Sequence, residues 1–556
     1  FWLKPFLAPA FQIQLKPQIY LKPDMAAAGS TTPSNEGALP RWRPVIFVVA
    51  FSSGCSILSG YDQGVIAGAI IFMERDLQLS KVQTEICVGC VNAAAALGAV
   101  LGGSFSHDHG RRWAISAANA LFILGVGLTC LSTGFCLLMA GRLVTGIAVG
   151  WGLVVGPLFC SELVPASLRG KLVSMGDVAC NLGITLGYVA GLVFYKLPDF
   201  WAWRGMLAVG LLPPVLLLFV APALPESPRW LASQRREADA REALGRLLWP
   251  GQVDEELRAI TEQVMGDEAA AKVPWREVLC PRHAPVRRMM LAGLGVAFFS
   301  QATGTEAAVY YVPHMLKEAG LESVVQQLLG TVLVGVVKLI VLLWASSRFD
   351  VWGRRPMLLA SGTCLLCSLL LLALGFQLQV NWLSLAALCL FMGSFSLGFS
   401  PLVCVVGTEV FPHWLRAKAM GVALLITRLV AGVVSSSFMT LQDLMTVPGS
   451  YLLFAAIALW SVLFVHRCVP ETVGLSLEEV QTRFYDPSDA AARGCRGHGR
   501  VLERVSLSQT PEIVGISAEE VRSPIRGRGG ASARELEGQA RRAAPAAQAP
   551  GAELQS

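Results

Sequence analysis

The most informative shortage in this 556-residue sequence is charge. Asp, Glu, Lys and Arg together make up 15% of the residues, whereas hydrophobic residues make up 54%. A soluble protein of this length needs far more charge to cover its surface, so the composition excludes an ordinary soluble protein. The formal net charge of +6 is modest, and the placement of the charges therefore carries more information than their sum.

The signatures of an enzyme are also missing from the sequence. We find no nucleotide-binding loop, no catalytic triad and no constellation of metal ligands. Two CxxC pairs occur in apolar stretches, where Cys acts as a small hydrophobic residue, and no cluster of His or carboxylates accompanies them: Cys87/Cys90 and Cys364/Cys367. We therefore expect no enzymatic activity, no cofactor and no metal.

Long hydrophobic stretches dominate what is present. A helix needs about 20 apolar residues to cross the roughly 30 Å hydrocarbon core of a bilayer. We identify twelve such stretches, at about 44–66, 85–106, 113–132, 137–159, 173–196, 204–222, 288–311, 325–346, 357–377, 383–407, 419–440 and 450–468. The predicted fold class is an all-α membrane protein with twelve transmembrane helices, surrounded by lipid bilayer.

The sequence repeats itself after about 245 residues. Each repeat holds about six hydrophobic stretches and the same three charged motifs in the same order: Gly110-Arg111-Arg112 and Gly353-Arg354-Arg355, Glu162 with Arg169 and Glu409 with Arg416, and Pro225-Glu226-Ser227 and Pro470-Glu471-Thr472. Such a repeat indicates two homologous halves. Two pseudo-symmetric six-helix halves are the architecture of a secondary transporter, with the substrate site where the halves meet.

The positions of Lys and Arg predict how the chain lies in the membrane. Loops on the cytoplasmic side carry an excess of Lys and Arg. The loops after the even-numbered stretches are the basic ones, whereas loops such as 374–382 and 441–449 lack Lys and Arg. We therefore expect a multi-pass protein with both termini in the cytoplasm, and the plasma membrane is favoured over an internal membrane.

Composition divides the chain into five parts. These are an N-terminal cytoplasmic tail (1–43), a first six-helix half (44–222), a cytoplasmic linker of short helices (223–287), a second half (288–484) and a disordered cytoplasmic tail (485–556). We hypothesise that 1–24 precede a native start at Met25; a targeting peptide is disfavoured because Pro breaks an amphipathic helix. The Arg run in the last part is interpreted as solvated, so no nucleic-acid partner is expected.

Six motifs in order resemble the sugar porter family of the major facilitator superfamily. They are Gly60-Tyr61-Asp62, Gly141-Arg142, Glu162 with Arg169-Gly170, Pro225-Glu226-Ser227-Pro228-Arg229-Trp230-Leu231, Asp350 with Gly353-Arg354-Arg355, and Pro470-Glu471-Thr472. The motifs are most similar to plant-type polyol and monosaccharide proton symporters. The resemblance implies a carrier of a sugar alcohol or monosaccharide together with protons by alternating access. The sequence leaves the oligomeric state open, and a monomer is favoured. A facilitative hexose uniporter and a non-transporting sugar sensor are the alternatives.

Two ionisable residues inside apolar stretches are candidates for proton coupling. Asp62 matches the acid of proton-coupled family members, and Arg142 matches the Arg that it faces. Charges within the membrane are costly and usually functional. A carboxylate beside Arg stays ionised, and loss of that contact during transport lets it bind a proton. The competing interpretation is a structural ion pair.

The resemblance also places a substrate site. Polar side chains that donate and accept hydrogen bonds suit a ligand with many hydroxyl groups. Those at matching positions are Asp177, Gln301, Glu306, Tyr310, Lys338 and Arg428, together with Cys404 and Thr427. Cys404 replaces a Trp on which the family stacks a sugar ring, and Thr427 replaces an Asn. The alternative is that these groups only join helices to one another.

The remaining charged motif residues are candidates for gating. In the family, such residues form ion-pair networks that hold the cytoplasmic gate closed; here they are Arg111, Arg112, Glu162, Arg169, Arg354, Arg355, Glu409 and Arg416. Positive-inside charge alone explains the Arg residues. It does not explain Glu162 and Glu409, which stand at matched positions. His107 replaces an acidic or Asn residue of the family pattern, which makes the first network the weaker match.

Overall fold

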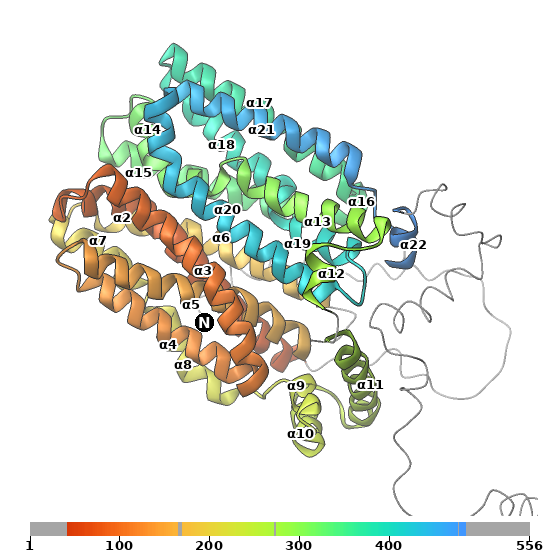
Figure 1. Ribbon diagram of the computed structural model, residues 1–556. Coiled ribbons are helices and arrows are strands. Elements are labelled where there is room, and N and C mark those ends of the chain that lie inside the picture. The colour runs from red at the N-terminus through yellow and green to blue at the C-terminus, as the bar shows by residue number, and fades with distance from the viewer. Residues whose placement is uncertain (1–41, 165–168, 272–273, 476, 485–556) are drawn as a thin grey trace, which may run out of the picture. The chain divides into compact units, whose positions relative to one another are not determined.

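The computed structural model describes residues 42–164, 169–271, 274–475 and 477–484. Over these residues the regular structure consists of α-helices joined by short turns and two 3₁₀ turns (Figure 1). The predicted N-terminal and C-terminal tails, 1–43 and 485–556, lie almost entirely outside the described residues. Met25, the predicted native start, lies outside them as well.

The described part of the first half contains seven helices, the last two of which belong to one membrane-spanning segment. They are α2 (Trp42–Asp76), α3 (Lys81–His109), α4 (Arg111–Cys130), α5 (Phe135–Leu163), α6 (Arg169–Phe194), α7 (Asp199–Val209) and α8 (Leu212–Val220). Helix α2 packs extensively on α6, and α5 packs on α3 and α4. The α2–α6 contact is close because glycines line it: a Cβ on Gly60 would lie 1.9 Å from the Cys180 carbonyl oxygen. Small residues let backbones approach in this way. Asp62, two residues from Gly60, is on the other side of α2, where it meets Arg142 of α5.

The linker and the second half complete the described chain. The linker contains η1 (Ala221–Ala223), α9 (Pro228–Ser233), α10 (Glu237–Leu247), η2 (Pro250–Gln252), α11 (Val253–Ala271) and α12 (Trp275–Leu279). The second half contains α13 (Ala284–Ala302), α14 (Thr305–Glu318), α15 (Val324–Ser346), α16 (Phe349–Trp352), α17 (Arg354–Leu378), α18 (Asn381–Leu397), α19 (Phe399–Val410), α20 (Arg416–Met445), α21 (Val447–Cys468) and α22 (Leu477–Thr482).

Eleven segments of the described chain are helical, long and apolar enough to cross a membrane. They match eleven of the twelve predicted stretches. The remaining stretch, predicted as one helix over 288–311, is interrupted between α13 and α14. Gly304 stands at this break with φ of +85°, a conformation that glycine adopts without steric cost. The seventh span is therefore two helices that meet inside the protein, and the twelve-helix fold is retained.

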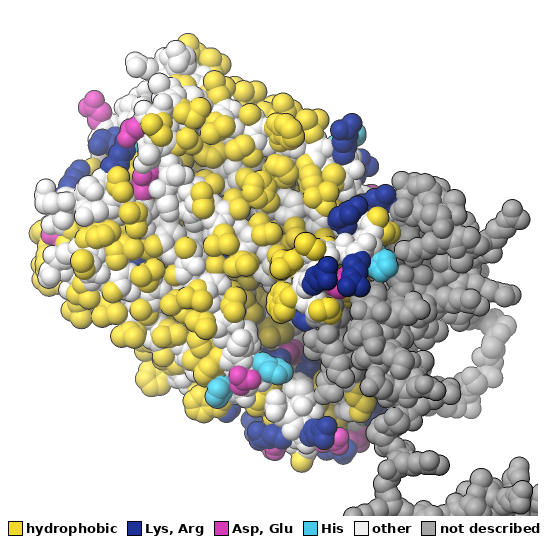
Figure 2. Space-filling view, viewed as in Figure 1, with side chains coloured by type: hydrophobic (Ala, Val, Ile, Leu, Met, Phe, Trp, Pro, Cys, Tyr) yellow, Lys and Arg dark blue, Asp and Glu magenta, His cyan; other side chains and the backbone are white. Residues whose placement is uncertain are grey.

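The outward surface of the helices is apolar. Large hydrophobic side chains such as Phe219 and Trp382 are 81% and 73% exposed. Figure 2 shows one face covered by hydrophobic side chains, with charged side chains gathered toward its margins. A soluble protein does not expose apolar surface on this scale. This pattern fits helices that are surrounded by the hydrocarbon of a bilayer.

Candidate functional site

The repeated Gly-Arg-Arg motifs form two nearly identical structures, at what we call the Arg-rich end of the helices. Gly110 and Gly353 have φ of +94° and +93°, and each precedes the first turn of a helix, α4 or α17. Glu226 accepts hydrogen bonds from the backbone N–H groups of Arg111 and Arg112, at 2.9 and 3.1 Å. Carboxylates stabilise helix N-termini because unpaired N–H groups and the helix dipole converge there.

The second half reproduces this arrangement with Glu471. Its carboxylate accepts from the backbone N–H groups of Arg354 and Arg355, at 3.0 and 3.1 Å. A side chain on Gly353 would meet Glu471 Oε2 at 2.7 Å, so only glycine leaves room for the carboxylate. The Pro-Glu-Ser and Pro-Glu-Thr motifs therefore act as caps for the helices that follow the Gly-Arg-Arg motifs.

Each candidate gating glutamate binds an Arg of its own half. Glu162 forms a two-point ion pair with Arg111, with N–O distances of 2.8 and 2.9 Å. Glu409 lies 3.1 Å from Arg354 and accepts a hydrogen bond from the Thr472 hydroxyl at 2.6 Å. Two-point pairs between Arg and carboxylate are among the stronger polar contacts in proteins. These contacts tie together the ends of helices within one half.

The other gating candidates make backbone contacts or lie outside the description. Arg112 and Arg355 donate to the carbonyl oxygens of Leu224 and His466. Arg416 donates weakly to the Phe411 carbonyl oxygen, at 3.4 Å. The side chains of Arg169 and Asp350 are outside the described set. In the sequence, Glu162 and Glu409 each stand seven residues before an Arg. Their described ion pairs are formed instead with the Arg residues of the Gly-Arg-Arg motifs.

Asp62 and Arg142 form a deeply buried ion pair. Arg142 Nη1 of α5 donates to Asp62 Oδ1 of α2 at 2.7 Å, and the two side chains are 1% and 2% exposed. Asp62 Oδ2 and Arg142 Nε and Nη2 are buried without a hydrogen-bond partner. Burying two charges is costly, and unpaired polar atoms add to that cost. The pair is therefore poorly explained as a device for stability alone.

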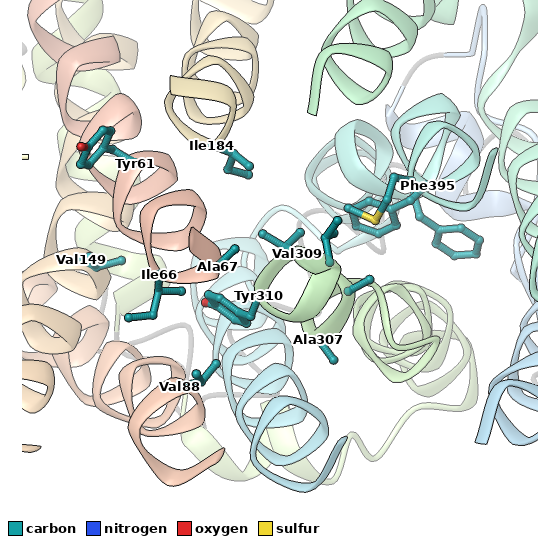
Figure 3. Packing of buried hydrophobic residues seen from close by; sticks show 14 of the residues in the cluster. Tyr61, Ile66, Ala67, Val88, Val149, Ile184, Ala307, Val309, Tyr310 and Phe395 are labelled. Carbon is teal, nitrogen blue, oxygen red and sulfur yellow. The ribbon is translucent and has the colours of Figure 1, made fainter. Parts of the chain in front are cut away.

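A second polar cluster lies between the halves, around Glu306 of α14. Glu306 Oε1 accepts a hydrogen bond from the Tyr310 hydroxyl at 3.2 Å, and Arg428 of α20 lies 3.7 Å from it. Asn92 of α3 completes the cluster from the first half, with 3.2 Å contacts to Tyr310 and Arg428. Figure 3 shows the Tyr310 ring extending from its helix toward Ile66 and Val88, which belong to the first half.

Further charged groups surround Cys180 of α6. Asp177, Lys338, Arg428 and Glu306 all act electrostatically on its thiol, so the four charges share one region. Lys338 of α15 is 4% exposed and sits 5.9 Å from the Phe395 ring centre. Cys404 of α19 is exposed, and both Asp177 and Arg428 act on its thiol. The two positive and two negative charges come from both halves.

Two predicted substrate residues, Gln301 and Thr427, make no described hydrogen bond to this cluster. Gln301 is buried at the end of α13, and its Oε1 atom has no hydrogen-bond partner. An unpaired buried amide oxygen is free to bind a ligand hydroxyl. Thr427 is buried as well, but its hydroxyl donates to the Leu424 carbonyl oxygen at 2.7 Å within its own helix. The structure thus satisfies Thr427 locally.

The proton candidates and the substrate candidates adjoin each other. Tyr310 interacts electrostatically with Asp62 and Arg142 as well as with Glu306 and Arg428. Cys87, on the same helix as Asn92, interacts electrostatically with both Asp62 and Arg142. The buried pair in the first half and the cluster between the halves are therefore close enough to interact electrostatically, which makes exchange between proton binding and ligand binding physically possible.

Sequence reasoning missed the contribution of α3. Asn92 stands in an apolar stretch with no motif around it, and only its isolation as a polar residue offered a signal. Toward the start of the same helix, Lys81 lies 2.6 Å from Asp443, and Glu85 accepts hydrogen bonds from the backbone N–H and hydroxyl of Thr440. These contacts join the halves at the end opposite the Arg-rich end.

A cavity at the Arg-rich end has a different composition. It is bounded by the end of α5 and by α10 and α11 of the linker, and its lining includes Glu162, Arg229 and Glu256 beside four Leu side chains and one Ile side chain. None of the predicted substrate residues lines it. We therefore place the candidate site at the Glu306 cluster, where the charges of both halves converge, and not in this cavity.

Comparison with known proteins identifies the family of the chain. Residues 45–484 match the family described as sugar (and other) transporter. The chain belongs to the sugar transporter family. The probable polyol transporter 4 of Arabidopsis thaliana is 36% identical over 485 residues, which cover 86% of this chain and 92% of that protein. Polyol transporter 5 of the same plant is 37% identical over 456 residues, covering 78% and 85% of the two chains.

Solved structures share the fold. The E. coli proton:xylose symporter XylE of the major facilitator superfamily, bound to 6-bromo-6-deoxy-D-glucose, superimposes with a TM-score of 0.67 at 24% identity. The match covers 80% of this chain and all of XylE. The predicted twelve-helix major facilitator fold is confirmed. As a member of the sugar transporter family the protein is a membrane transporter and not an enzyme, as the sequence predicted.

Proposed function

We propose that this protein transports a sugar alcohol or a monosaccharide together with a proton, by alternating access. The observation that carries the proposal is the Glu306 cluster. Its charged groups come from both halves, and it adjoins the Asp62–Arg142 pair. A site at the junction of two halves is exposed to each side of the membrane in turn when the halves rock against one another.

The chemistry of the cluster supports a polyhydroxylated substrate. Each hydroxyl group both donates and accepts a hydrogen bond, and the cluster offers both kinds of partner: the carboxylates of Asp177 and Glu306 accept, whereas Lys338 and Arg428 donate. The charges cancel, so a neutral ligand is favoured over an ion. Cys404 stands where a stacking Trp is expected, which favours a flexible open-chain polyol over a flat ring. The names of the Arabidopsis relatives point the same way.

Asp62 is proposed as the proton-binding group, with Arg142 as its partner. One hydrogen bond at 2.7 Å holds the pair, and the second carboxylate oxygen has no partner. Lengthening this contact during transport would leave a buried carboxylate without its counter-charge, a state in which the neutral acid is favoured. Tyr310 lies within electrostatic reach of Asp62 and is bonded to Glu306, so substrate binding is positioned to influence the pair.

We propose that the Arg-rich end faces the cytoplasm, as the positive-inside rule predicts. Both termini then lie in the cytoplasm, and the plasma membrane is the proposed location of this monomeric transporter. The hydrogen bonds between the halves at Lys81, Glu85 and Asn92 are concentrated in the middle and at the other end. The structure then corresponds to a state closed toward the outside. The proposed gating residues act at the cytoplasmic end of each half.

Uptake of labelled sugars by transport-deficient cells tests the proposal. The panel contains sorbitol, xylitol and mannitol as open-chain ligands, and glucose and xylose as cyclic ones. We expect accumulation of at least one polyol against its gradient, abolished by a protonophore. Uptake of hexoses alone that is insensitive to the protonophore would replace the proposal with a facilitative uniporter. Binding without any uptake would replace it with a sensor.

A further inference from the structure

Helices α3 and α20 come from different halves and lie antiparallel along a line of polar contacts, which we call the α3–α20 seam. Moving along α3 toward the Arg-rich end, the contacts join Lys81 with Asp443, Glu85 with Thr440, and Asn92 with Arg428. A Cβ on Gly89 would lie 1.8 Å from the Ser436 Oγ atom, so the two helices touch closely between these contacts. The seam is thus continuous from the outer end to the Glu306 cluster.

Asn92 is the contact at which the seam enters that cluster. Its side chain is buried, with 2% of its surface exposed. Its Oδ1 atom accepts a hydrogen bond from Arg428 Nη1, and its Nδ2 atom donates to the Tyr310 hydroxyl oxygen, each at 3.2 Å. The hydroxyl then donates to Glu306, which also faces Arg428. One side chain of the first half therefore holds both groups that contact Glu306.

We propose that Asn92 is a positioning residue that couples closure of the outer end to the shape of the substrate site. While α3 and α20 are joined, Asn92 holds Tyr310 and Arg428 against Glu306. When the helices separate to open the outer end, both hydrogen bonds break and the two groups are free to turn toward a ligand. This inference rests on the proposed function, because it takes Glu306 and Arg428 as substrate contacts.

The coupling gives the two conformations different affinities for the ligand. A ligand shifts a conformational equilibrium only when it binds the two states differently. In the joined state, Glu306 and Arg428 partly satisfy one another through Tyr310 and Asn92. In the separated state, the loss of Asn92 leaves Arg428 and Tyr310 with unused hydrogen-bonding capacity, which ligand hydroxyls can satisfy. The helix that closes the outer end thereby also tunes the site.

The amide of Asn92 fits both of its contacts. It accepts from the Arg428 guanidinium while it donates to a Tyr310 hydroxyl whose own proton points to Glu306. Aspartate in its place would accept from Arg428 more strongly, because the bond would join opposite charges, but it has no proton to donate to Tyr310. Leucine would keep the volume and remove both contacts. Asn92→Asp and Asn92→Leu should therefore move the equilibrium in opposite directions.

The experiment measures how fast Cys180 reacts with a membrane-impermeant maleimide added outside intact cells, with labelling resolved by mass spectrometry. Cys180 adjoins the charged cluster and is partly exposed, so outward opening should raise its rate. We expect Asn92→Leu to raise the rate about tenfold, because its two hydrogen bonds no longer favour the closed state. Asn92→Asp should lower it below that of the wild type.

Asn119 supplies the matched control. It is another asparagine of the first half with 2% of its surface exposed, and its Nδ2 atom is buried without a hydrogen-bond partner within α4. Asn119→Leu should leave Cys180 labelling unchanged. Equal changes for Asn92→Leu and Asn119→Leu, or an unchanged rate in both Asn92 variants, would overturn the inference. If Asn92→Leu does not fold, slower labelling of Asn92→Asp supports it and an unchanged rate overturns it.

Uptake kinetics of sorbitol provide a second readout. Asn92→Leu should change the KM for sorbitol by about tenfold, because Arg428 and Tyr310 no longer adopt one arrangement, with a smaller change in maximal rate. A fall in maximal rate at constant KM would indicate a purely structural role and overturn the inference. Cys180 labelling requires no substrate. If the Asn92 variants change Cys180 labelling but the protein transports no sugar of the panel, the proposed function is rejected and the role of Asn92 in closing the outer end is supported.

Discussion

At the scale of single residues, the Asp62–Arg142 pair stands apart from the other ion pairs described. Both side chains are almost completely buried, yet three of their polar atoms lack partners. On the same helix, Asp76 pairs with Arg204 at 2.8 Å, but there Trp203 and the carbonyl oxygens of Phe200 and Ser132 supply further contacts. A structural ion pair is normally satisfied in this second way. The incomplete pairing of Asp62 is therefore the feature that favours the proposed coupling role over a purely structural ion pair.

Asp62→Asn should abolish accumulation while leaving exchange of substrate across the membrane measurable. A proton entering through about 100 mV gains about 2.3 kcal/mol, and one pH unit adds about 1.4 kcal/mol. Together these can sustain a concentration ratio of roughly several hundred. The variant should reach a ratio of about one, because an amide does not carry the proton. Proteoliposomes with an imposed proton gradient provide the measurement.

Asp76→Asn is the matched control, since it also removes an Asp–Arg pair from α2. It should lower the thermal stability of the protein and preserve accumulation. Wild-type accumulation by Asp62→Asn under the same gradient would show that this carboxylate does not couple transport to protons.

At the scale of elements, the interruption between α13 and α14 decides where the substrate candidates stand. Gly304 takes the left-handed conformation, the chain turns, and α14 starts one residue later. Glu306 and Tyr310 are one turn apart on α14 and so share a face, which explains their hydrogen bond. In a continuous helix over 288–311, the geometry of the helix would have fixed the angle and distance between the Gln301 and Glu306 side chains. The break frees them from it.

Gly304→Ala should destabilise the protein and disturb transport together. A left-handed residue with a side chain costs about 1–2 kcal/mol, and the added Cβ would lie 3.0 Å from the Phe454 ring. Gly103→Ala in α3 is the control, because a Cβ there meets nothing within 4 Å and alanine favours a helix. Thermal unfolding in detergent and sorbitol KM give the comparison. Equal unfolding temperatures for the two variants would contradict the proposed strain at Gly304.

At the scale of the whole molecule, the two halves have the same local structure at the Arg-rich end. Glu162 binds Arg111 in the first half, and Glu409 binds Arg354 in the second. The described hydrogen bonds that join the halves lie elsewhere, at Lys81, Glu85 and Asn92 and also at Thr185 and Tyr188 of α6. In this conformation the ion pairs therefore hold each half rigid, so that it can move as a unit. A cytoplasmic gate closed by both networks together would belong to the conformation that is open toward the outside.

Glu162→Gln and Glu409→Gln should act additively on stability in this conformation. Each removes an ion pair and should cost about 1–3 kcal/mol. The described contacts of Glu162 and Glu409 involve different partners, so the double variant should equal the sum of the single variants within about 0.5 kcal/mol. Denaturant unfolding of the four proteins in detergent measures this. A larger coupling energy would mean that the networks meet across the halves and would favour the gating role that the sequence suggests.

The sequence by itself determined the membrane location, the number of hydrophobic stretches, the division into two halves and the family. These properties depend on local composition, on the length of apolar runs and on motifs whose spacing is visible along the chain. Gly110 and Gly353 stood out because the Gly-Arg-Arg motif repeats, and Asp62 and Arg142 stood out because charge is rare in apolar stretches.

Only the tertiary structure decided which charge meets which. It paired Glu162 with Arg111, it broke the seventh span at Gly304, and it brought Asn92 to Arg428, 336 residues away along the chain. The physical reason is that such contacts depend on how helices pack and rotate against one another. Packing is set by many small side chains at once, as at Gly60 and Gly89, and no local pattern around Asn92 records the outcome.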